Sequence, residues 1–86
     1  MNIQDLKNEL TCVDDEMLKL FIRHLQLTQQ LGKERAKDGK GLYDRKAEEE
    51  LLERVVANTP QNMQNFSIEF FRTLMNISKE YFAENK

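Results

Sequence analysis

The first 37 residues carry apolar side chains at alternating steps of three and four residues. This spacing is the heptad seam of a helix that packs lengthwise against another helix. It predicts one helix over about 3–37, in which His24 is the only polar residue on the seam. The apolar seam residues are Ile3, Leu6, Leu10, Val13, Met17, Leu20, Leu27 and Leu31.

A helix of this length is too long for a compact chain of 86 residues. It would span roughly 50 Å, whereas a compact domain of this size has a radius of gyration of about 12 Å. The far half of the helix therefore needs apolar cover from another chain. We expect an intertwined homodimer.

Turn-forming residues divide the rest of the chain into a loop over 38–43 and two further helices. Asp44 is a good N-cap for a short helix over about 45–57, which Pro60 ends soon after. A third helix is predicted over about 65–84, because apolar residues recur there at helical spacing. Its expected core residues are the aromatics Phe66, Phe70, Phe71 and Tyr81. The prediction is an all-α fold with three helices (long, short, medium) in a single domain over 1–86.

Composition narrows the classes of function. The net charge is −2 with both signs interspersed, which gives no electrostatic footprint for nucleic acid or an anionic membrane. Cys12 and His24 are the only residues of their kinds, so no disulfide and no metal site with cysteine–histidine spacing is expected. With a lone cysteine, no apparent signal peptide and no long apolar run, we expect a cytoplasmic protein.

Several local motifs resemble the all-helical (type II) class of chorismate mutases, over about residues 6–82. The most specific is Asp44, followed by the acidic and leucine-rich helix over 45–55. The others are Leu6-Lys7 with Asp14, then Gly32-Lys33-Glu34-Arg35, and Ser78 on the third helix.

The resemblance implies the rearrangement of chorismate to prephenate in aromatic amino-acid biosynthesis, without a cofactor or a metal. It implies an intertwined dimer whose pockets lie between helices and receive one cation from the partner chain. The implied catalytic residues are Arg35, facing the ether oxygen, and Glu48, facing the ring hydroxyl. The implied substrate-binding residues are Lys7 (from the partner), His24, Asp44 and Ser78.

The sequence departs from the family pattern at cationic positions. His24 and Ala47 stand where the family has arginines, and Phe82 replaces a polar donor to the ether oxygen. Lys7 and Arg35 keep the charge of an arginine and a lysine but change its geometry. The alternative is therefore a catalytically degenerate protein of the same fold, which binds a small acid or another protein. Lyase activity on a relative of chorismate is a third possibility, without specific support.

Overall fold

The computed structural model describes residues 1–85; Lys86, the last residue of the predicted domain, lies outside the described residues. Three helices follow the predicted order, and no strand occurs in the described part of the chain. The helices are α1 (Ile3–Ala36), α2 (Arg45–Ala57) and α3 (Gln64–Glu84). A short 3₁₀ turn, η1 (Gln61–Met63), leads into α3. The all-α class with three helices is confirmed.

Local signals in the sequence set the starts of α1 and α2. The side chain of Asn2 accepts a hydrogen bond from the Asp5 N–H at 2.8 Å and caps α1. The side chain of Asp44 accepts one from the Ala47 N–H at 2.7 Å and caps α2. Each cap satisfies an N–H group that the first turn of a helix leaves unpaired. By contrast, α3 begins with no side-chain cap and continues directly from η1.

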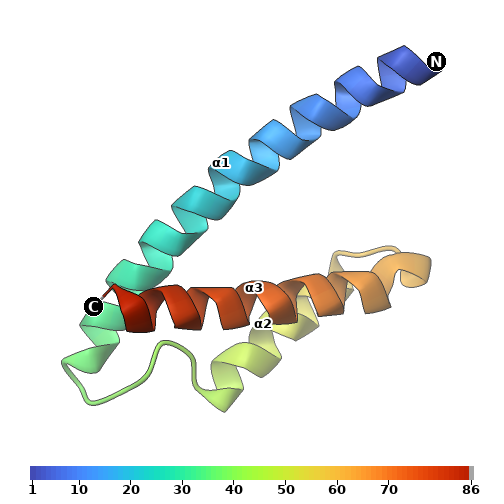
Figure 1. Cartoon of the computed structure of the whole chain (residues 1–86). Helices are drawn as coiled ribbons and strands as arrows, with labels where there is room; N and C mark the ends of the chain where they lie inside the picture. Colours follow the sequence, from blue (N-terminus) through green and yellow to red (C-terminus); the bar gives the residue numbers. More distant parts are fainter. Residues whose placement is uncertain (86) are drawn as a thin grey trace.

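Helix α3 packs against both of the others, so it is the central element of the chain. The last turns of α1 and the end of α3 lie together, and from there the two helices diverge (Figure 1). At this junction Gln29 of α1 donates a hydrogen bond to the backbone carbonyl of Asn85. Among the described residues of the single chain, few apolar side chains are buried: Leu42, Val55, Met75 and Phe82.

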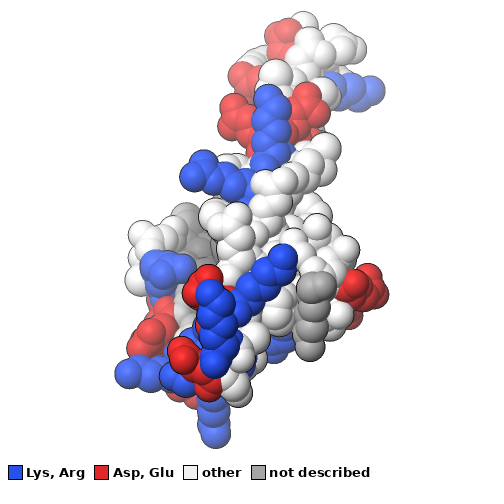
Figure 2. All heavy atoms as spheres, turned by 90° about the vertical axis from the view of Figure 1, so that its left-hand side faces the viewer, with Lys and Arg blue, Asp and Glu red and all other residues white. Residues whose placement is uncertain are grey.

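The N-terminal half of α1 projects away from the other helices (Figure 1). Figure 2 shows it as a stalk above the body of the molecule, with charged side chains on its sides. The extents are 53 × 28 × 15 Å and the radius of gyration is 15.8 Å, above the value of about 12 Å for a compact chain of this length. The single chain is therefore less compact than a domain of its length, as the predicted length of the first helix implied.

The expectation that Phe66 and Phe70 are core residues is wrong for a single chain. Their exposed fractions are 73% and 56%, because α1 diverges from α3 where they lie. Leu6, Leu10 and Val13 on the α1 seam are exposed as well. No helix in residues 1–85 combines the length and the apolar character needed to cross a membrane.

Candidate active site

One face of α1 points toward the end of α3. His24, Thr28, Gly32 and Arg35 follow one another at steps of three or four residues, which places them on one side of the helix. Thr28 and Gly32 are buried there. The hydroxyl of Thr28 donates to the backbone carbonyls of its own helix, at 2.9 Å from His24 O. Thr28 therefore presents only a lone pair or its methyl group to a neighbour.

His24 and Ser78 are brought together from α1 and α3. The Ser78 Oγ lies 3.3 Å from His24 Nδ1, and Ser78 is 0% exposed. The Ser78 hydroxyl also donates to the Leu74 carbonyl at 2.8 Å, one turn earlier on α3. Burial lowers the pKa of His24, because desolvation disfavours the charged imidazolium. The seam histidine is thus a half-buried and hydrogen-bonded group.

Tyr43, in the loop before α2, joins this pair and was missed at the sequence level. Its side chain hydrogen-bonds to Ser78. Burial raises the pKa of Tyr43; the hydrogen bond to Ser78 acts in the opposite direction, and the Glu48 carboxylate raises it further. The tyrosine therefore remains a neutral phenol at pH 7. Nothing in the sequence around a loop tyrosine signals a buried serine 35 positions later.

Glu48 on α2 forms an ion pair with Lys79 on α3. Lys79 follows Ser78, and adjacent residues on a helix point about 100° apart. Ser78 therefore faces α1 while Lys79 reaches α2. This lysine was also missed by sequence reasoning, because only the packing of α2 against α3 selects it from the cations of the chain.

Arg35 is held by the loop that follows α1. Its Nε donates to the Gly41 carbonyl at 2.6 Å, and its Nη2 lies 3.3 Å from Asp44 Oδ2. The guanidinium keeps further N–H donors for a ligand, and the side chain is 25% exposed. The hydrogen bond from the Ala47 N–H, and secondly Arg35, lower the pKa of Asp44. Asp44 thus links the α2 cap to Arg35.

Phe82 occupies the position next to Gly32 of α1. A Cβ atom on Gly32 would come within 2.6 Å of the Phe82 ring, so the two helices touch here through backbone and ring. Phe82 is buried and puts an aromatic ring where the family pattern has a polar donor. Ala47 at the start of α2 is half-buried and carries no charge.

Lys7 lies far from His24 along α1 in the single chain. It is exposed on the projecting half of α1. Seventeen positions separate it from His24, which is about 25 Å along the helix axis. Any contact of Lys7 with a pocket built around His24 requires a second chain.

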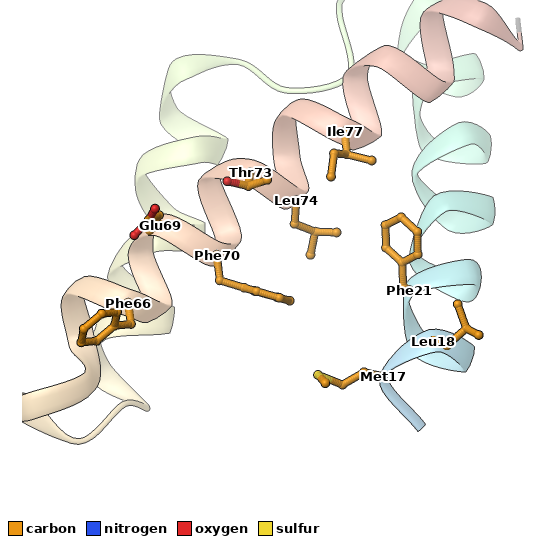
Figure 3. A pocket seen from close by; sticks show the side chains of 9 residues that line it. All are labelled: Met17, Leu18, Phe21, Phe66, Glu69, Phe70, Thr73, Leu74 and Ile77. Carbon is orange, nitrogen blue, oxygen red and sulfur yellow. The ribbon is translucent and has the colours of Figure 1, made fainter. Parts of the chain in front are cut away.

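We call His24, Arg35, Tyr43, Asp44, Glu48, Ser78 and Lys79 the polar cluster. Away from it lies an apolar cleft of about 550 Å³, between the diverging parts of α1 and α3. Figure 3 shows Met17 and Phe21 of α1 facing Phe70, Leu74 and Ile77 of α3 across the open space. Glu69 is the only ionisable residue in its lining. Such a cleft suits apolar side chains better than a charged metabolite.

The polar cluster has the groups for recognising a small anion with a hydroxyl group. It combines the Arg35 guanidinium, the Lys79 ammonium, the His24 imidazole and the Tyr43 phenol with the Glu48 carboxylate. No three histidine, cysteine or carboxylate side chains in residues 1–85 come together as they would around a metal ion. The arrangement favours binding and electrostatic stabilisation, which a unimolecular rearrangement needs.

A family model described as chorismate mutase type II matches residues 6–82 of the chain. No curated protein and no solved structure gives a match. The matched range takes in α2 and most of α1 and α3, and it includes every residue of the polar cluster as well as Lys7.

Proposed function

Since the chain belongs to the type II chorismate mutase family, we propose that it binds chorismate at the polar cluster and rearranges it to prephenate as an intertwined homodimer. The observation that supports the proposal is the set of polar contacts that the helices make: Arg35 with Asp44, Ser78 with His24, and Glu48 with Lys79. Arg35, Glu48 and Ser78 are also positions that the family motif assigns to the substrate. Asp44 stands beside them as the carboxylate that holds Arg35.

The chemistry needs cations more than acids or bases. Chorismate carries two carboxylates, and its rearrangement moves negative charge onto the ether oxygen as the bond breaks. An N–H donor aimed at that oxygen stabilises the transition state more than the ground state. Arg35 supplies this donor, and its bonds to Gly41 and Asp44 fix the guanidinium before the ligand arrives.

Glu48 would accept a hydrogen bond from the ring hydroxyl of the substrate. Its ion pair with Lys79 fixes the carboxylate between α2 and α3. His24, held in place by Ser78, would face one carboxylate of the substrate. Lys7 of a second chain would meet the other, which is why activity in this proposal depends on the dimer.

The surface of α1 supports the dimer. Its uncovered seam is apolar, and the cleft beside it is lined by apolar residues. Charge also changes along the helix. Residues 3–20 hold five acids and two lysines, whereas residues 23–37 hold four cations and one acid. Two copies of α1 packed antiparallel would pair opposite charges, and the same arrangement carries Lys7 toward the His24 end of its partner.

A second candidate function is ligand or protein binding without efficient catalysis. Phe82 and His24 favour it, because they replace a polar donor and an arginine. Removing one preorganised donor from a closed site costs about 10²–10³ in rate. The losses at His24, Ala47 and Phe82 would then leave little turnover.

The test follows chorismate disappearance with the purified protein. We expect slow turnover by the wild type and an increase of about 10²-fold or more in the variant His24→Arg/Ala47→Arg, because two guanidinium clamps are restored. Adding Phe82→Gln restores the polar donor as well. Arg45→Lys, on the exposed side of α2, is the control and should leave the rate unchanged.

Turnover by the wild type at ordinary enzyme rates would contradict the second candidate function, which is binding without efficient catalysis. Absence of turnover in the wild type and in every restored variant, with helical content intact, would refute the proposed mutase activity.

A further inference from the structure

Ser78 has one hydroxyl proton, and its oxygen lies 2.8 Å from the Leu74 carbonyl and 3.3 Å from His24 Nδ1. A backbone carbonyl can only accept a hydrogen bond, so the Ser78 proton goes to Leu74 at the shorter distance. A lone pair of the Ser78 oxygen is then left for His24 Nδ1, which must act as the donor.

This proton count fixes the tautomer of His24. In the neutral imidazole one ring nitrogen carries the proton and the other is an acceptor. With the proton on Nδ1 for Ser78, Nε2 bears the lone pair. Nε2 has no hydrogen bond to another described residue, and no side-chain nitrogen or oxygen in residues 1–85 is both buried and unpaired. Nε2 is therefore accessible from outside the protein.

Charged groups on the neighbouring elements do not raise the pKa of His24, since burial is the only cause of its displacement. On α2 and α3, Glu48 and Lys79 pair with each other. From the loop comes Tyr43, which is uncharged at pH 7. On α1 itself Arg23 points about 100° away. Arg35 lies three turns further along and is paired with Asp44. Burial alone displaces the pKa of His24, and it does so downward.

A neutral imidazole repels a carboxylate at Nε2, because the lone pair of Nε2 would face a lone pair of the carboxylate oxygen. On the basis of the proposed function, we propose that His24 binds a carboxylate of the ligand through Nε2 only after a proton is added there. Ligand binding then takes up a proton, and Ser78 is the positioning residue that accepts the hydrogen bond from Nδ1–H. A site with arginine at this position has a permanent charge and no such coupling.

The sign of the pH dependence follows from linkage. A bound carboxylate stabilises the imidazolium, so the pKa of His24 is higher in the complex than in the free protein. Between these two values the affinity falls by about tenfold per pH unit as the pH rises. Below the free value and above the bound value the affinity is flat with respect to His24.

The experiment measures chorismate binding by calorimetry at several pH values from about 5.5 to about 8. Titrations in phosphate and in Tris, whose ionisation enthalpies differ, give the number of protons taken up. We expect uptake approaching one proton at neutral pH, and an affinity that falls as the pH rises. His24 is the only histidine, so NMR of its ring nitrogens reads its tautomer and its pKa directly. Saturation with chorismate should raise that pKa.

Three variants serve as controls, each checked for helical content. His24→Arg should bind without proton uptake at all these pH values, and His24→Gln should bind weakly without uptake. Ser78→Ala fits a close helix contact and should lose the Nδ1–H tautomer while the protein stays folded. A purely structural Ser78 would leave the tautomer unchanged, which would contradict the positioning role.

The outcomes separate the two proposals. Chorismate binding with no proton uptake and an unchanged histidine pKa would overturn the coupling while leaving the proposed function intact. Binding by His24→Arg but not by the wild type, even at the lowest pH, would also overturn the coupling. If neither protein binds chorismate at any pH, the proposed function fails and the coupling fails with it.

Discussion

At the scale of single residues, His24 links the stability of the fold to pH. Burial lowers its pKa in the folded chain relative to the unfolded chain. The unfolded state therefore binds more protons in this range, and stability rises with pH. The contribution is fully present above the unfolded value of about 6.5. A lower pH therefore has two opposite effects through this residue. It decreases the stability of the ligand-free protein, and it favours the binding of a carboxylate.

We expect the urea midpoint of the ligand-free protein to fall between about pH 7.5 and about pH 5.5. The variant His24→Gln has no group that titrates at this position, and its midpoint should fall less over the same range. Chemical denaturation followed by circular dichroism gives both curves. Equal slopes for the two proteins would mean that burial in the folded chain does not lower the pKa of His24.

At the scale of the helices, the contact of Gly32 with Phe82 sets how closely α1 approaches α3. A glycine inside a helix normally costs about 1 kcal/mol relative to alanine. Here a Cβ would lie 2.6 Å from the ring of a buried side chain. Overpacking of this kind typically costs about 1–3 kcal/mol. The steric cost of the added methyl group should therefore exceed the stability that alanine gains from its higher helix propensity.

We therefore predict that Gly32→Ala lowers the melting temperature by several degrees, although alanine is the better helix former. The double variant Gly32→Ala/Phe82→Leu should recover part of the loss, because a smaller side chain makes room for the new methyl group. Gly41→Ala is the control, since nothing lies within 4 Å of a Cβ there. A stabilised Gly32→Ala protein would show that the ring moves aside at little cost.

The helices themselves could be predicted because their signals are local. Asp44 as an N-cap and Pro60 as a stop bracket α2, which the structure places over Arg45–Ala57. The site was harder to predict, because it depends on which turn of one helix meets which turn of another. Tyr43 and Lys79 join it through such long-range packing. Arg35 and Asp44 are nine residues apart, and they join it through the loop between α1 and α2.

At the scale of the whole molecule, the exposed seam of α1 determines how many chains the protein needs. Leu10 is 61% exposed in the single chain and lies on the projecting half of α1. An antiparallel partner helix would cover it. Because a twofold interface uses each residue twice, a change at Leu10 acts twice in every dimer.

We predict that Leu10→Glu shifts the protein from dimer to monomer in analytical ultracentrifugation. Burying an unpaired carboxylate costs several kcal/mol, which corresponds to about 100-fold or more in the dissociation constant. Asn8→Glu places a carboxylate on the other side of the same helix and should leave the dimer intact. A wild-type protein that sediments as a stable folded monomer would contradict the dimer and, with it, the role of Lys7.

The projecting half of α1 also has a consequence for inheritance. If each pocket takes Lys7 from one chain and His24 from the other, a pocket is the product of two gene copies. A chain altered at Lys7 and a chain altered at His24 would each form defective homodimers. Their mixed dimer would hold one pocket with both alterations and one pocket with neither. Two alleles that fail alone would then complement each other in the same cell.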